Sequence, residues 1–95
     1  MAKTKPAAKV EVPIKRVQVG VRLEKRLVKV LKAVAEFHDM TLGEALEEIV
    51  LHSFEGAQAF FPSARERIRA LKRIYGMDYG VHDNSRFVEK GGEGA

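Results

Sequence analysis

KRVQVGVRL, residues 15–23, alternates between apolar and polar side chains. The apolar parity holds Val17, Val19, Val21 and Leu23. The polar parity holds Arg16, Gln18, Gly20 and Arg22. A period of two predicts a β-strand with one buried face. No second segment alternates comparably, so the sequence supplies no partner within the chain for this strand.

Two amphipathic helices are predicted directly after the strand. Over residues 24–37 apolar residues recur at helical spacing, and the cations mostly lie opposite them: Lys25, Arg26, Lys29 and Lys32. After a break at residues 38–40, Thr41 stands three residues before Glu44, the spacing of a reciprocal capping box. The apolar stripe behind this box predicts the second helix: Leu42, Ala45, Leu46, Ile49, Val50 and Phe54.

A third helix is predicted at about residues 63–75. Ser63 is its expected cap and Gly76 its expected terminator. Its apolar stripe is Ala64, Ile68, Leu71 and Tyr75, and the helix is basic because it also carries Arg65, Arg67, Arg69, Lys72 and Arg73.

Charge is distributed unevenly along the 95 residues. The net charge of +4 divides into +8 over residues 1–32, −6 over residues 33–64 and +2 over residues 65–95. A basic first third that contains the strand favours a surface that meets a polyanion. Nucleic acid and an anionic membrane surface are the candidates. The membrane is disfavoured because the apolar stripes are needed as core and the chain has no tryptophan.

Size and composition favour an oligomer. A chain this short builds a small core, and without cysteine it has neither disulfides nor thiolate metal ligands. Two copies of the strand could pair antiparallel across a two-fold axis while four helices cover their apolar face. The predicted dimer core is Val17, Val19, Val21, Leu23, Leu27, Leu31, Val34, Leu42, Leu46, Ile49 and Val50.

The polar parity of such a ribbon would face outward. A two-stranded ribbon fits the DNA major groove, where arginine reads guanine and glutamine reads adenine. The expected base-reading residues are therefore Arg16, Gln18, Gly20 and Arg22, with the glycine letting the backbone lie close to the bases. The alternative is an ordinary edge strand whose charges are merely solvated.

The run VQVGVRLEKRLVKVLKAVAEFHDMTLGEALEEIV resembles the ribbon-helix-helix family of prokaryotic DNA-binding proteins, which includes the Arc and MetJ repressors. The resemblance implies a mostly α fold with one β-strand, an intertwined homodimer with a two-stranded antiparallel intermolecular ribbon. Here a C-terminal third helix would follow. The expected domains are a disordered basic arm at 1–14, the ribbon-helix-helix domain at 15–56, a C-terminal extension at 57–90 and a flexible tail at 91–95.

The resemblance also implies roles for residues. Alternate strand positions read bases in this family, and by position these are Gln18, Gly20 and Arg22. Amides at the start of the second helix grip a phosphate, which maps onto Thr41, Leu42 and Gly43 and suits the positive end of a helix. Lys15 and Lys25, with the N-terminal lysines, are expected to add salt-dependent affinity. Glu24 departs from many members, which have proline there.

The expected function is a sequence-specific regulator of transcription, usually a repressor, that binds double-stranded DNA in the cytoplasm and on the nucleoid. Two alternatives stay open: an antitoxin whose C-terminal segment binds a toxin protein, and an unspecific architectural DNA binder. No enzyme, cofactor or metal site is expected. His38, His52 and His82 are scattered, and no nucleophile and base stand at a diagnostic spacing. No apolar run approaches the roughly 20 residues of a membrane span.

Overall fold

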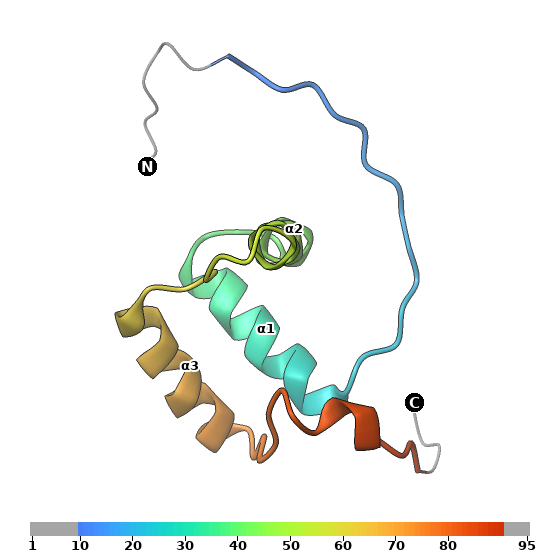
Figure 1. The fold of residues 1–95 in the computed structure, drawn as a ribbon, viewed down its shortest axis with the longest axis vertical. Coiled ribbons are helices and arrows are strands. Elements are labelled where there is room, and N and C mark those ends of the chain that lie inside the picture. The colour runs from blue at the N-terminus through green and yellow to red at the C-terminus, as the bar shows by residue number, and fades with distance from the viewer. Residues whose placement is uncertain (1–9, 91–95) are drawn as a thin grey trace.

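The computed structural model describes residues 10–90. Most of the predicted basic arm, residues 1–9, and the predicted tail at 91–95 therefore lie outside the described part. Three α-helices follow one another along the chain (Figure 1): α1 (Lys25–Phe37), α2 (Leu42–Phe54) and α3 (Pro62–Ile74). A short 3-10 helix, η1 (Asn84–Arg86), comes after them. No helix of the described part is long and apolar enough to cross a membrane.

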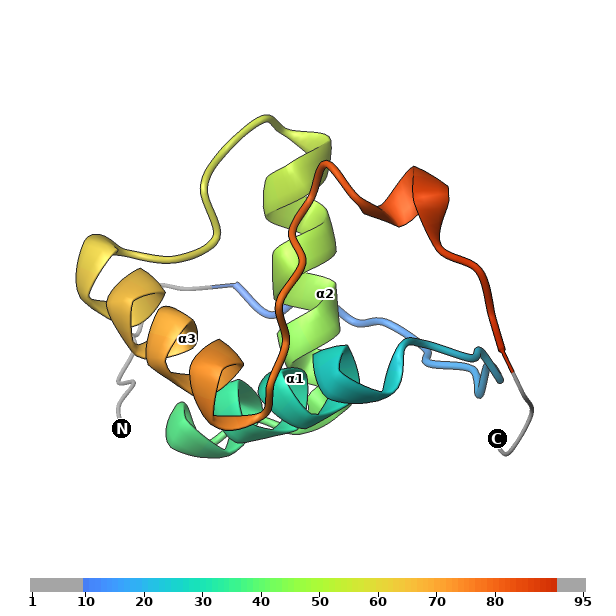
Figure 2. The same ribbon diagram turned by 90° about the horizontal axis from the view of Figure 1, so that it is seen from below.

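α1 is the central helix of the fold. It contacts both α2 and α3, and α3 runs antiparallel to it (Figures 1 and 2). Within residues 10–90 the buried apolar residues are few and small: Val30, Val34, Ala35, Ala45 and Ala64. No side chain in this part is fully buried. The three helices therefore enclose only a thin core.

Local chemistry sets the starts of α2 and α3. The Thr41 hydroxyl accepts a hydrogen bond from the Glu44 amide at 3.0 Å, and the Glu44 carboxylate accepts one from the Thr41 amide at 2.9 Å, which confirms the capping box. The prediction of Ser63 as the cap of α3 is wrong. That helix begins at Pro62, and its N-cap residue, Phe61, makes no side-chain hydrogen bond. Proline suits the first helical position because the missing N–H needs no partner there.

The predicted strand at residues 15–23 is wrong. Residues 10–24 follow an open path outside the helices (Figure 1), and the structure contains no strand anywhere in residues 10–90. The mostly α fold with one β-strand, and the intertwined dimer with an intermolecular ribbon, are therefore corrected to a fold of three helices. The alternation of apolar and polar residues indicates only which side chains would share a face of an extended strand. A strand also needs neighbouring backbone to pair with, and the described part of the chain offers none.

Candidate nucleic-acid interface

Residues 10–23 form a continuous exposed segment. Every one of these residues is exposed, and the segment runs beside the helices to the start of α1 (Figure 1). Arg16, Gln18 and Arg22, which the sequence predicts to read bases, all lie in this segment and are exposed. A Cβ atom built on Gly20 would meet nothing within 4 Å. The segment is therefore open to a large partner along its length.

Arg16 is tied to α2 by a two-point ion pair. Its Nε and Nη2 atoms donate to the two carboxylate oxygens of Glu47, each at 2.8 Å. The hydrogen bond and the charge of Arg16 lower the pKa of the Glu47 carboxyl group. The two side chains are 57% and 46% exposed, so water and salt compete for the contact. The guanidinium is held in place but stays accessible to another anion.

Arg22 also has a carboxylate partner. It forms an ion pair with Glu89 of the C-terminal segment, and both side chains are well exposed. The two arginines predicted to read bases are thus paired with acids from two different parts of the chain. A carboxylate binds a guanidinium with the same geometry as a phosphate. Each of the two guanidinium groups is therefore paired with a carboxylate and stays exposed to water.

At the start of α2, where the sequence predicts a phosphate site, one backbone amide already has a partner within the helix. The Thr41 hydroxyl caps the Glu44 amide, which leaves the amides of Leu42 and Gly43 among the first donors of the helix. Gly43 is exposed and Leu42 is half-buried. The Glu44 carboxylate lies at the same helix end, and its charge opposes an approaching phosphate.

Lys15 and Lys25, the two predicted phosphate contacts at the ends of the segment, are both exposed. Lys25 is the first residue of α1, whose first turn contains no acidic residue. A cation at the positive end of a helix is unfavourable by itself. The Glu24 carboxylate, which caps the same helix end, offsets that charge.

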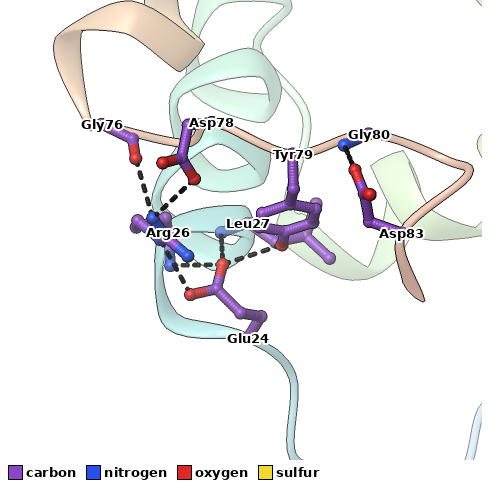
Figure 3. Close-up of polar contacts among 8 residues, drawn as sticks. All are labelled: Glu24, Arg26, Leu27, Gly76, Asp78, Tyr79, Gly80 and Asp83. Atoms are coloured by element: carbon purple, nitrogen blue, oxygen red, sulfur yellow. Dashed lines mark hydrogen bonds and ion pairs between the residues drawn. The ribbon is translucent and has the colours of Figure 1, made fainter. Parts of the chain in front are cut away.

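Glu24 joins the start of α1 to the C-terminal segment (Figure 3). Its carboxylate accepts hydrogen bonds from the Arg26 and Leu27 amides at 3.1 Å, and from the Tyr79 hydroxyl at 2.7 Å. Burial alone would raise the pKa of Glu24, but the hydrogen bonds outweigh it and lower the pKa to about 2. Burial and the same contact raise the pKa of Tyr79 to about 12.

Arg26 completes this cluster. Its Nη1 atom donates to the Gly76 carbonyl at 2.9 Å and contacts Asp78 at 3.2 Å, and its guanidinium lies 5.4 Å from the centroid of the Tyr79 ring. Sequence reasoning missed the cluster. Glu24 could be recognised as a residue at a helix start, but nothing local marks Tyr79, 55 residues away, as its partner.

The turn between α1 and α2 opens into an acidic hollow. Its lining consists of His38, Asp39, Met40, Glu44, Glu47, Glu48, Leu51 and His52. Carboxylates gathered in this way repel a polyanion, so DNA is not expected to sit in the hollow. Within residues 10–90 no three histidine or acidic side chains are arranged to hold a metal ion.

The predicted dimer-core residues divide into two groups. Val34 is buried within one chain, and five others are half-buried there: Leu27, Leu31, Leu42, Leu46 and Ile49. The remainder are exposed: Val17, Val19, Val21, Leu23 and Val50. On α2 the exposed apolar surface continues from Val50 to Leu51 and Phe54, which are 58% and 79% exposed. One chain therefore covers only part of its apolar surface.

No protein-family model matches this chain. Comparisons with curated proteins and with solved structures found no match either. Membership of the ribbon-helix-helix family therefore stays a prediction from the sequence.

Proposed function

We propose that the protein binds double-stranded DNA through residues 15–23 and acts as a repressor of transcription. The observation that supports this proposal is the continuous exposure of a basic segment outside the helices, which contains Arg16, Gln18 and Arg22. Arginine and glutamine side chains can contact both phosphates and base edges. A bound protein would then block access to a promoter.

A single extended segment favours the minor groove. The major groove accommodates a helix or a two-stranded ribbon, whereas extended arms that carry arginine enter the narrower minor groove. There Arg16 and Arg22 would respond to the narrow width of A·T-rich sequences, and Gln18 would bond base edges. Gly20 would let the backbone lie close to the groove floor. The two arginines would exchange Glu47 and Glu89 for the DNA.

Phosphate contacts would come from the two ends of the segment and from α2. Lys15 and Lys25 are exposed point charges that suit the DNA backbone, and the amides of Leu42 and Gly43 could donate to a phosphate. Thr41 would position those amides through its cap. Such contacts carry no sequence preference, so they would set the dependence of affinity on salt.

A second copy of the chain is part of the proposal. The exposed apolar surface on α2 and on residues 17–23 is more than a chain with such a thin core is expected to leave in water. Association of two copies through the face formed by Val50, Leu51 and Phe54 would cover the part of this surface that lies on α2. This arrangement needs no pairing of strands.

The antitoxin alternative has less support. A toxin-binding segment is expected to stay loose until its partner arrives. Here α3 contacts α1, and Tyr79 is bonded to the start of α1. Those contacts favour a C-terminal part that completes the small fold.

Binding-site selection from a random duplex library, at one near-physiological salt concentration, tests the proposal. The wild-type chain is compared with a Gln18→Ala/Arg22→Ala variant. The matched control is Gln58→Ala/Arg86→Ala, which removes the same two side-chain types from exposed positions outside the segment. We expect the wild type and the control to enrich one short A·T-rich motif, and the Gln18/Arg22 variant to lose it.

Two other outcomes would change the conclusion. Binding without enrichment by all three proteins would replace sequence-specific regulation with unspecific DNA coating. Absence of DNA binding by the wild type would refute the proposal and turn attention to a protein partner of the C-terminal segment.

A further inference from the structure

One face of α3 carries a row of arginines that residues 15–23 do not account for. Arg65, Arg69 and Arg73 stand four residues apart and are all exposed. Positions with this spacing lie above one another on the same side of a helix. At about 1.5 Å of rise per residue, the row is about 12 Å long. The row forms a narrow ridge of positive charge, and one exposed acid, Glu66, lies beside it three residues before Arg69.

The row is unfavourable for the isolated helix. Like charges at i and i+4 destabilise a helix, and among residues 10–90 none of the three arginines forms an ion pair. Arg65 donates only to the neutral Gln58 side chain, at 3.2 Å. By contrast, Arg67 of the same helix lies over the Phe37 ring, 3.6 Å from its centroid. Arg67 therefore packs against α1, whereas the three arginines of the row, with Glu66 beside them, form no ion pair within residues 10–90.

The row lies apart from the exposed N-terminal segment. Ala64 is buried, and α3 contacts α1. Helical spacing puts Arg69 and Arg73 on the side of α3 away from Ala64. Residues 15–23 lie on the other side of α1 from α3 (Figure 1). One rigid duplex that lies along the segment would therefore not lie along the row.

We propose that the Arg65, Arg69 and Arg73 row binds the backbone phosphates of a second DNA duplex, so that the protein bridges two duplexes. The inference rests on the proposed function, because residues 15–23 would hold the first duplex. Duplex DNA fits this surface because its phosphates form a regular line of charge, and arginine binds phosphate with a bidentate fork. Such contacts would be independent of sequence and sensitive to salt.

A two-duplex capture assay tests the bridge. One duplex is immobilised on beads, the protein is added, and retention of a second, fluorescent duplex is measured. Retention of the protein on the beads is measured in parallel and reports binding to the first duplex. The test variant is Arg69→Gln/Arg73→Gln, which keeps two good helix formers in place. The control is Arg86→Gln/Lys90→Gln, which removes the same charge from exposed positions outside α3.

We expect the wild type and the control to capture the fluorescent duplex. The Arg69/Arg73 variant should stay on the beads but capture roughly tenfold less of it, since about two phosphate contacts are lost. Capture by the variant at the wild-type level would overturn the inference, and so would equal loss of both duplexes. A wild-type protein that fails to bind the immobilised duplex would instead refute the proposed function.

Discussion

At the scale of single residues, carboxylates of the same chain would compete with DNA for the two arginines of the candidate interface. Arg16 and Arg22 are each paired with a carboxylate, and all four side chains are largely open to water. Pairs of this kind hold a guanidinium in position at little cost in free energy. The carboxylates would also discourage weak contacts with DNA, because each must be displaced before a phosphate or base can bind. Acidic residues beside the segment are thus expected to set its affinity.

The Glu47→Gln substitution should strengthen DNA binding. It removes the charge that competes for Arg16, and exposed pairs of this strength imply a gain of about two- to fivefold in affinity. Glu48→Gln is the matched control because it makes the same charge change on the same helix and lines the acidic hollow without contacting Arg16. Fluorescence anisotropy with one labelled duplex measures both. Equal gains for the two variants would assign the effect to net charge and not to the ion pair.

At the scale of elements, prediction succeeded where the determinants are local. The start of α2 follows from Thr41 and Glu44, which stand three residues apart. The helical spacing of the apolar residues is also visible in the sequence. The strand prediction failed because alternation at residues 15–23 says nothing about what the backbone pairs with. The attachment of the C-terminal segment to α1 was equally invisible, since Glu24 and Tyr79 share no local pattern.

The bond between Tyr79 and Glu24 should make stability depend on pH under acid conditions. The pKa of Glu24 is about 2 in the folded chain, below its ordinary value of 4.5. A carboxyl group with a lowered pKa stabilises the fold above the ordinary value, and that contribution is lost as pH falls from about 4.5 to about 2. Tyr79→Phe removes one of the responsible hydrogen bonds. The variant should melt at a lower temperature at pH 7, and its melting temperature should fall less steeply through this window.

Circular dichroism melts from pH 7 down to pH 2.5 measure this difference. Tyr75→Phe is the control, because the Tyr75 ring contacts Lys29 but its hydroxyl does not bond Glu24. If wild type and both variants give superimposable profiles of melting temperature against pH, the Tyr79 contact does not contribute to stability. If the melting temperature of Tyr79→Phe is lower by the same amount at every pH, the substitution removes packing and the contact is not linked to the ionisation of Glu24.

At the scale of the whole molecule, the described part of the chain is less compact than is usual for its length, and residues 10–24 lie outside the helices. The radius of gyration is 15.7 Å, whereas a compact domain of 95 residues is expected to have about 12 Å. Within residues 10–90 the five buried residues are valines and alanines, while Phe54 and Phe61 are about four-fifths exposed. The sequence indicated a shortage of core through its small size. It could not indicate which of the apolar residues one chain covers by itself, because that depends on how α1, α2 and α3 pack.

The α2 face should therefore hold two copies together, and Phe54→Asp should separate them. A charge placed among Val50, Leu51 and their copies would be desolvated without a partner. The dissociation constant of the dimer should therefore rise at least tenfold. Light scattering after size exclusion should give twice the chain mass for the wild type. Its melting temperature should rise with concentration, because association stabilises only the folded state. Val81→Asp, at an equally exposed valine outside the helices, should leave the mass unchanged.

A wild-type monomer whose melting temperature is independent of concentration would contradict self-association.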